Sequence, residues 1–274
     1  FGFDLYAALV YSSELDTLKV LVTDNVITAR NDLTSDSWGI RIHSRNQHPS
    51  SLAVRLFNIT NNIIDGKYMD RTKGMQLQAH SESTELWTAS NNQVLNVNYR
   101  GVEIHNWNGG DFSNNTIRRA YSELSNYSDN TSAACEIVSQ NVNFVSNVID
   151  SCYGVGLRIY NMGGTIDSNT ITNNGTGIYM SGSYDYPSNP TVRYNNITNN
   201  YAYAIRTTSG SNPVINYNDL FSNSDYWGNY YDIYHEVESS TFDELNARLN
   251  YWGETTTAEM TEGDNPKNIT TIYD

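Results

Sequence analysis

The sequence predicts an all-β protein, a right-handed parallel β-helix (solenoid) of about eight coils with a short C-terminal helical cap. Three observations predict this fold class. A bend motif of asparagine, any residue and an apolar residue recurs along the chain, and a short strand pattern follows each copy. The shortest repeat spacing, 22 residues, leaves no room for a helix beside two strands. Leucine-rich repeats have a similar length, but their leucine pattern is absent.

The bend asparagine is the first repeated element. Its copies are Asn25, Asn62, Asn92, Asn115, Asn147, Asn169, Asn195 and Asn218. They are separated by 37, 30, 23, 32, 22, 26 and 23 residues, and we interpret the longer separations as loop insertions. We expect each asparagine to turn inward and hydrogen-bond to the copies one coil above and below, because a buried turn backbone needs partners. The apolar residues, from Ile27 to Leu220, are expected to stack in the core.

The second repeated element is a strand in which apolar and polar residues alternate. Its copies begin at residues 39, 74, 101, 134, 156, 177, 204 and 231, and five of them begin with glycine. We expect these glycines to admit a tight turn into the strand. Together with the bend motif, each repeat then holds three short strands and three turns, which is one coil.

The two ends of the solenoid differ. Thr241 and Glu244 form a capping-box pattern that predicts the start of a short helix. We therefore divide the chain into a parallel β-helix over 1–239 and a C-terminal cap and tail over 240–274. The chain starts at Phe1 with strand-like residues and without a signal-like segment, so we expect a trimmed part of a longer protein.

Composition excludes several classes of function. The formal net charge is −14, which disfavours nucleic acid as a partner. No apolar run approaches the ~20 residues that span a bilayer, so membrane insertion is not expected. The two cysteines match no metal or redox spacing and are expected to be buried thiols. Seven Asn-x-Ser/Thr sequons are consistent with a secreted or cell-surface protein.

The strand pattern also predicts which side chains face outward. The first outward ladder is Arg41, Gln76, Glu103, Glu136, Arg158, Tyr179, Arg206 and Asp232. The second is His43, Gln78, His105, Val138, Tyr160, Ser181, Thr208 and Tyr234. Neighbouring rungs should lie ~4.8 Å apart, so the ladders form one surface. Its mixture of arginine, histidine, glutamate and tyrosine suits a charged, hydroxylated substrate.

Two glutamates on successive rungs are the centre of this candidate site. Glu103 and Glu136 should have carboxyl groups ~5 Å apart, as in a retaining glycosidase. Because two such groups do not both ionise easily, we expect one to have a raised pKa and to donate a proton. His105 is an alternative acid or base, so these three are the candidate catalytic residues. The candidate substrate-binding residues, which would clamp acidic groups or stack on sugar rings, are Arg41, His43, Gln76, Arg158, Tyr160, Tyr179, Arg206 and Trp107.

A structural explanation of the same ladders stays open. Opposite charges on neighbouring rungs, such as Glu136 beside Arg158, also stabilise ordinary sheets. The sequence has no Ser-His-Asp order, glycine-rich phosphate loop or zinc-type cluster, so no metal or cofactor is assigned. Loop carboxylates such as Asp65 and Asp70 would suit calcium, but no calcium motif accompanies them.

The C-terminal region carries a resemblance to a known family. Residues 245–260, LNARLNYWGETTTAEM, and 263–274, GDNPKNITTIYD, together with the asparagine coils, resemble disaggregatase and related surface β-helix proteins of methanogenic archaea. The coil pattern covers nearly the whole chain, whereas the segments at 250–253 and 265–268 are the narrower match. The resemblance implies a secreted or cell-surface enzyme that degrades a matrix polysaccharide containing uronates and amino sugars and so separates aggregated cells. It also implies a chain that continues past Asp274, and it assigns no catalytic residue.

Three functions are therefore in competition. The first is hydrolysis of an acidic polysaccharide by the glutamate pair. The second is β-elimination from a uronate, in which Arg158 or Arg206 neutralises the carboxylate while His105 or Tyr160 moves the proton. The third is a surface module that binds glycan without cleaving it. The sugar, its linkage and the oligomeric state are not determined by the sequence.

Overall fold

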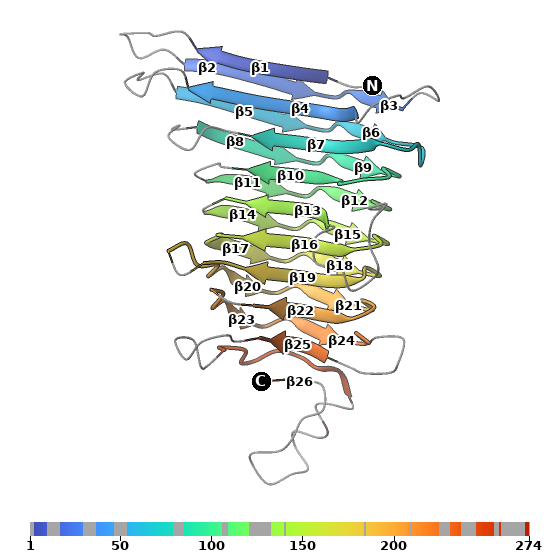
Figure 1. Ribbon diagram of the computed structural model, residues 1–274, viewed down its shortest axis with the longest axis vertical. Helices are drawn as coiled ribbons and strands as arrows, with labels where there is room; N and C mark the ends of the chain where they lie inside the picture. The colour runs from blue at the N-terminus through green and yellow to red at the C-terminus, as the bar shows by residue number, and fades with distance from the viewer. Residues whose placement is uncertain are drawn as a thin grey trace.

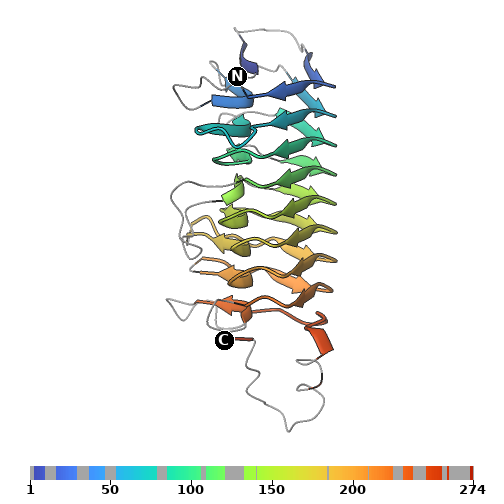
Figure 2. The ribbon, with the colours of Figure 1, turned by 90° about the vertical axis from the view of Figure 1, so that its right-hand side faces the viewer.

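The protein folds as stacked β-coils, which confirms the predicted fold class. The computed structural model describes residues 3–9, 17–29, 37–46, 54–78, 85–105, 109–120, 133–139, 141–183, 185–208, 210–224, 231–236, 245–254, 258 and 272–273. The coils follow one another along the long axis from the N-terminus to the C-terminal region, as Figure 1 shows. In the perpendicular view each coil forms one layer of the stack (Figure 2).

Three parallel sheets, called A, B and C here, run along the stack. Sheet A contains β1 (Phe3–Leu9), β4 (Ser37–Asn46), β7 (Thr72–Gln78), β10 (Val102–His105), β13 (Ala133–Val138), β16 (Val155–Tyr160), β19 (Thr176–Ser181), β22 (Tyr203–Thr207), β25 (Tyr231–His235) and β26 (Ile272–Tyr273). Sheet B contains β2 (Thr17–Thr23), β5 (Val54–Thr60), β8 (Glu85–Ser90), β11 (Gly110–Ser113), β14 (Val142–Val145), β17 (Gly164–Asp167), β20 (Thr191–Arg193) and β23 (Val214–Asn216). Sheet C contains β3 (Val26–Thr28), β6 (Ile63–Asp65), β9 (Gln93–Leu95), β12 (Thr116–Arg118), β15 (Val148–Asp150), β18 (Thr170–Thr172), β21 (Asn196–Thr198) and β24 (Asp219–Phe221). The eight strands in each of sheets B and C agree with the predicted eight coils.

The predicted asparagine ladder lies at the corner between sheets B and C, and we call it the B–C ladder. Asn115 shows the repeating contact: its backbone nitrogen and its Nδ2 both donate to Asn147 Oδ1, at 2.9 and 3.1 Å. Its Nδ2 also donates to the carbonyl of Ala89, at 2.9 Å. The ladder runs from Asn25 to Asn250, one rung beyond the last predicted copy. Each residue before a ladder asparagine has a positive φ, which an asparagine or aspartate adopts more readily than a bulky residue. These residues are Asp24, Asn61, Asn91, Asn114, Ser146, Ser168, Tyr194, Tyr217 and Leu249.

A second ladder, which the sequence analysis did not predict, lies at the corner between sheets C and A. We call it the C–A ladder. Asn174 Oδ1 accepts from the backbone nitrogen of Cys152 at 3.0 Å, and Asn200 Oδ1 accepts from Asn174 Nδ2 at 3.1 Å. Asn223 continues the ladder and donates to the carboxylate of Asp232 at 2.9 Å. The backbone of this corner is thereby satisfied over the C-terminal half of the stack.

The core consists of apolar columns between the three sheets. Ile64, Val94, Ile117, Ile149, Ile171, Ile197 and Leu220, the apolar residues of the bend motif, are buried. Ile27, in the first coil, is only partly buried. Cys135 and Cys152 are buried free thiols, as predicted.

The glycines that begin the strands of sheet A have a different role from the one expected. None of Gly39, Gly74, Gly101, Gly156 and Gly177 has a positive φ, so no turn conformation requires them. They are needed because the neighbouring coil is close: a Cβ on Gly101 would lie 2.7 Å from both the carbonyl of Ala134 and Ile117 Cγ2. Close approach of two coils, rather than a tight turn, is therefore the physical reason for this column.

The C-terminal region departs from the expected cap. Thr241 and Glu244 lie outside the described residues. Residues 245–252 are not helical, and Asn246 and Tyr251 pair with Val214 and Asp219 of the last coil. The described helical residues come later, at Gly253, Glu254 and Ala258. This segment repeats the bend motif, so its backbone continues the B–C ladder; the division of the chain at 239/240 stays a prediction. Within the described ranges, no helix is long and apolar enough to span a bilayer.

Candidate functional site

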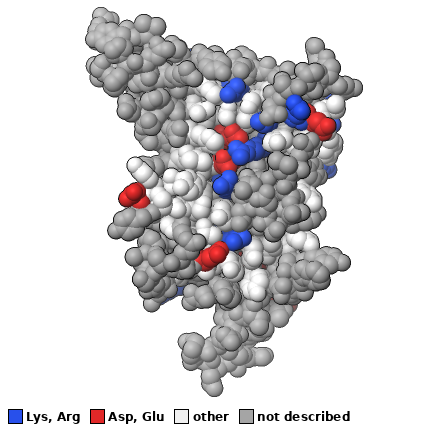
Figure 3. Space-filling view, viewed as in Figure 1, with Lys and Arg blue, Asp and Glu red and all other residues white. Residues whose placement is uncertain are grey.

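The outer face of sheet A contains the predicted ladders. The Cα pairings confirm the first ladder in the order Arg41, Gln76, Glu103, Glu136, Arg158, Tyr179 and Arg206. The second ladder is in register in the order His43, Gln78, His105, Val138, Tyr160 and Ser181. Figure 3 views this face, and charged side chains gather along its middle. The geometric basis of the predicted site is therefore present.

The last rung of both ladders was assigned wrongly. Arg206 pairs with Tyr234, so Tyr234 belongs to the first ladder and Asp232 does not. Asp232 is buried, with 4% of its surface exposed, and its carboxylate accepts a hydrogen bond from Asn223. The reason is that alternation breaks where each strand of sheet A begins, because the small residue and the apolar residue after it both face inward. Asp232 occupies the position of that small residue.

Glu103 and Glu136 lie on adjacent rungs and are joined by an arginine. Arg100 Nη1 donates to Glu103 Oε1 at 2.6 Å and to Glu136 Oε1 at 3.2 Å. Both glutamates are 5% exposed, whereas 31% of the Arg100 side chain is exposed. The pair is therefore a nearly buried carboxylate centre covered by a guanidinium group.

Two further cationic or polar groups surround Glu136. His105 Nε2 lies 3.0 Å from Glu136 Oε1, and Arg158 Nη1 lies 2.9 Å from Glu136 Oε2. Burial favours the neutral carboxyl, but the hydrogen bond with His105 and the charges of Arg100 and Arg158 outweigh it and lower the pKa of Glu136. The expectation of a proton donor with a raised pKa is therefore wrong for Glu136.

Glu103 connects the carboxylate centre to the residues of β4 and β7. Gln76 Nε2 donates to Glu103 Oε2 at 2.8 Å, and Gln76 Oε1 accepts from Arg41 Nε at 2.8 Å. His43 Nε2 lies 2.9 Å from the same Gln76 oxygen. A continuous polar network thus extends over five successive coils, from Arg41 to Arg158.

A tyrosine cluster continues the face beyond Arg158. The Arg206 guanidinium lies over the rings of Tyr179, Tyr203 and Tyr234, at 5.8, 5.7 and 5.4 Å from their centroids. Arg206 Nη2 also pairs with Glu236 Oε2 at 3.0 Å. Tyr231 extends the cluster, with its ring 6.0 Å from that of Tyr203. The face therefore combines a charged half with an aromatic half.

Sequence reasoning missed the column that precedes the glycine column. Arg100, Tyr203 and Tyr231 belong to it, as does Lys73, whose Nζ lies 5.3 Å from the centroid of the Trp38 ring. The strand patterns were read from the glycine onward, so this column was not assigned to either ladder. The sequence signal was nevertheless present: in several coils an aromatic or basic residue directly precedes the small one.

The remaining predicted residues are placed as follows. Tyr160 is half-buried on the second ladder, and Trp107 lies outside the described residues. Asp65 Oδ1 accepts from the backbone nitrogen of Lys67 and from Asn96 Nδ2, at 2.9 and 3.0 Å, as in an ordinary turn. Among the described residues, no group of three or more histidines, cysteines, aspartates or glutamates has the geometry of a metal site.

Comparison with known proteins supports the fold. Residues 136–248 match the family described as "Right handed beta helix region". No curated protein and no solved structure matches the chain. Together with the three parallel sheets, the family match shows a right-handed parallel β-helix. This fold is common among polysaccharide-degrading enzymes, including pectate lyases and glycoside hydrolases, and among surface proteins.

Proposed function

We propose that the outer face of sheet A binds and cleaves an acidic polysaccharide. The observation that carries this proposal is the arginine-rich network from Arg41 to Arg158, which continues into the tyrosine cluster around Arg206. Guanidinium groups suit carboxylates and sulfates, and tyrosine rings offer flat faces and a hydroxyl to sugar rings. Four of the twelve arginines gather here on a chain of net charge −14, so this face differs in character from the rest of the surface.

Between the two cleavage chemistries, the geometry favours β-elimination. Hydrolysis by the pair needs one carboxyl group that is protonated before the reaction, and the lowered pKa of Glu136 opposes that role for Glu136. Glu136, as a carboxylate, can only accept, so it fixes the hydrogen of His105 on Nε2 and leaves Nδ1 as a basic lone pair. A base oriented by a carboxylate is the arrangement that proton abstraction requires.

The elimination step assigns a role to each group. His105 Nδ1 removes the proton from C5 of a uronate while Arg158 neutralises the carboxylate that makes this proton acidic. The electron pair of the C5–H bond forms the C4–C5 double bond, and the C4–O bond breaks. The leaving oxygen takes up a proton, and we assign the role of proton donor to Tyr160. Tyr160 belongs to the same ladder as His105, two rungs along the sheet.

The resemblance to disaggregatase suggests the source of the polysaccharide. We propose a cell-surface matrix glycan that contains uronates and amino sugars, and a secreted or surface location for the protein. No nucleic-acid partner or resident cofactor is part of this proposal. The sequence segments that support it are those at 250–253 and 265–268.

The test is to incubate the protein with uronate-containing glycans and to follow absorbance in the near ultraviolet. Elimination produces an unsaturated sugar that absorbs there, and hydrolysis does not. His105→Gln should lower kcat about 10²- to 10⁴-fold, as expected for loss of a general base. Arg193→Ala is the matched control, because Arg193 forms an exposed ion pair with Asp167 on another sheet.

Two results would contradict elimination. Products with saturated non-reducing ends, found by mass spectrometry, would show hydrolysis and return the glutamate pair to the catalytic role. Binding without any cleavage, unchanged in Glu103→Gln and Glu136→Gln, would show a glycan-binding module in which these ion pairs are structural.

A further inference from the structure

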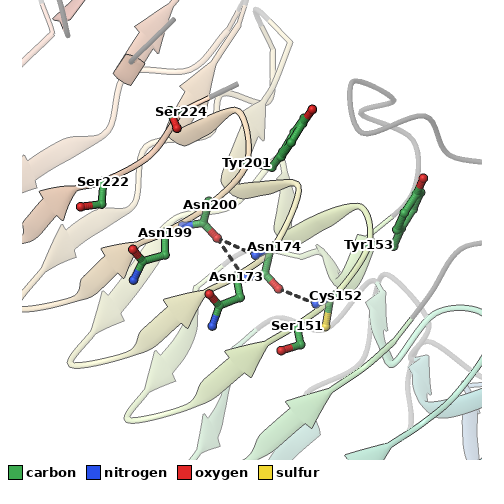
Figure 4. Close-up of a pocket in the computed structure, with 10 residues that line it drawn as sticks. All are labelled: Ser151, Cys152, Tyr153, Asn173, Asn174, Asn199, Asn200, Tyr201, Ser222 and Ser224. Carbon is green, nitrogen blue, oxygen red and sulfur yellow. Dashed lines mark hydrogen bonds between the residues drawn. The ribbon is translucent and has the colours of Figure 1, made fainter. Parts of the chain in front are cut away.

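A groove of about 550 Å³ lies at the corner between sheets C and A, apart from the charged network. Its wall on the side of sheet C consists of Ser151, Asn173, Asn199 and Ser222, which occupy equivalent positions on four successive coils and all have a positive φ. Its other wall includes Tyr153 and Tyr201. Figure 4 shows both tyrosine rings extending outward on the same side of the groove, with the serine and asparagine side chains across from them.

The floor of the groove is the C–A ladder. Asn174 and Asn200 are 2% and 1% exposed, and their amide groups are held by ladder hydrogen bonds of 3.0–3.2 Å. Burial raises the pKa of the Cys152 thiol to about 12, so this floor residue stays neutral. The floor is therefore fixed before any ligand binds, which lowers the entropic cost of binding.

The wall residues have polar atoms that face the groove. Asn199 is exposed, and in the described part of the chain its amide donates one long hydrogen bond, 3.5 Å to Thr198 Oγ1. Asn173 and Ser151 both donate to Asp150 Oδ1, at 2.9 Å, which leaves their own oxygens as acceptors. The groove thus presents amide and hydroxyl groups, which both donate and accept hydrogen bonds.

The two tyrosines are separated by one coil. Cys152, Asn174 and Asn200 are successive rungs of the C–A ladder, so Tyr153, Gly175 and Tyr201 are successive residues beside it. Two rungs correspond to ~9.6 Å along the stack. Gly175 carries no ring, and its backbone packs against the neighbouring coil, since a Cβ there would lie 2.8 Å from the carbonyl oxygens of Tyr153 and Gly154.

We propose that this groove binds a neutral oligosaccharide. None of its ten lining residues is an aspartate, glutamate, lysine, arginine or histidine, whereas the outer face of sheet A has Arg100 and Arg158 paired with two glutamates. Sugar hydroxyls and N-acetyl groups match amide and hydroxyl walls, and the tyrosine rings can stack on the apolar faces of sugar rings. The inference stands beside the proposed function and does not rest on it.

The test is calorimetric titration of the whole chain with chitotetraose, maltohexaose and xylohexaose, and with tetragalacturonate as the acidic comparison. We expect saturable binding of at least one neutral oligosaccharide. Tyr201→Ala should weaken it about 3- to 10-fold, the usual contribution of an aromatic contact. Asn199→Gly should weaken it about 2- to 10-fold through a lost hydrogen bond, without backbone strain, because glycine adopts the positive φ at this position.

Matched controls separate this site from the charged face. Asn114→Gly changes an exposed asparagine of similar φ at the other corner, and Arg158→Ala changes the charged face. Both should leave neutral binding unaltered. The inference is overturned if no neutral oligosaccharide binds, if Tyr201→Ala and Asn199→Gly bind like the parent, or if Arg158→Ala abolishes neutral binding. Cleavage of a uronate glycan without neutral binding would overturn this inference alone.

Discussion

Asp232 is a single residue whose surroundings differ from those of its equivalents in the other coils. By register it lies opposite Ala204, in the column that holds Gly177 and other small residues. Its carboxyl group is buried and receives one hydrogen bond, from Asn223 at 2.9 Å. The residue thus ends the C–A ladder by supplying an acceptor, but it also places an ionisable group in the interior.

The stability of the protein should therefore depend on pH through this residue. Burial raises the pKa of Asp232 from 3.8 to about 7, against the opposing effect of the Asn223 hydrogen bond. The neutral acid fits the folded state, so its stabilising contribution is fully present below pH 3.8 and is lost as the pH rises through about 7. Asp232→Asn keeps an acceptor for Asn223 without the charge. Compared with the parent, the variant should gain stability between pH 4 and pH 8, by up to about 4 kcal/mol at 1.36 kcal/mol per pKa unit.

Urea unfolding of both proteins at several pH values measures this difference. Other titrating groups are common to both proteins and cancel in the comparison. Asp219→Asn, which makes the same substitution at an exposed aspartate of β24, is the control. A parallel pH dependence of the parent and Asp232→Asn would show that Asp232 ionises in the folded protein at its ordinary pKa.

At the scale of the element, the B–C ladder should contribute strongly to stability. Asn147 accepts two hydrogen bonds from Asn115 and donates to the carbonyl of Phe112 and to Asn169 Oδ1. Asn147→Ala would remove these four buried hydrogen bonds and leave the backbone nitrogen of Asn115 without its partner, whereas Asn115 Nδ2 keeps the carbonyl of Ala89 and Asn169 Oδ1 keeps the backbone nitrogen of residue 147. A buried unsatisfied group costs ~1–3 kcal/mol and each further lost hydrogen bond ~1 kcal/mol, so we expect a loss of about 3 kcal/mol or more of unfolding free energy.

The matched control is Asn143→Ala on β14. Asn143 is exposed and hydrogen-bonds to Asp111 and Thr165 at the surface, where water replaces lost partners. The expected cost is about 0.5 kcal/mol. Denaturant unfolding measures both variants, and equal losses would mean that the ladder asparagines contribute no more than ordinary surface polar residues.

The two ladders show what a repeat pattern can and cannot predict. The B–C ladder was predictable because asparagine recurs in every coil beside a buried apolar residue. The C–A ladder was not, because only the later coils have Asn174, Asn200 and Asn223 there, whereas earlier coils have Ala120 and Cys152 in equivalent positions after a residue of positive φ. The earlier coils fill this corner with small apolar side chains, and the later coils fill it with hydrogen-bonded asparagines. No single residue type therefore marks the corner in the sequence.

The outward positions of the candidate site were predictable because they also follow a repeated pattern, the alternation of apolar and polar residues along each strand. Strict alternation assigned the outward positions correctly from Arg41 to Arg206. It failed at Asp232, where two adjacent inward positions interrupt the alternation. It also could not show that Arg100 lies over Glu103 and Glu136, because this contact depends on side-chain length and direction.

At the scale of the whole molecule, charge is distributed unevenly. On sheets C and B, Arg118 and Arg193 each pair with one aspartate and are 45% and 47% exposed, so these ion pairs contribute little. On sheet A, Arg100, Arg158 and Arg206 pair with Glu103, Glu136 and Glu236, and Arg41 and Lys73 leave an excess of positive charge among the described residues of this face, on a chain of net charge −14. An acidic glycan is therefore attracted by one face and repelled by the rest of the molecule.

Attraction by the arginine face and repulsion by the rest of the molecule act over different distances. Binding of an acidic glycan should therefore depend on salt in two stages. At 0.01 M ionic strength the Debye length is about 30 Å, and the whole negative charge acts on the ligand. At 0.15 M it is about 8 Å, and only the arginine face acts; above that, salt weakens this attraction too. Affinity for tetragalacturonate should thus rise from low to physiological salt and fall toward 1 M, with neutral oligosaccharides as a salt-independent control. If the affinity falls steadily from the lowest salt concentration upward, the local arginines dominate at all distances. If the affinity does not change with salt, charge does not contribute to binding of the ligand.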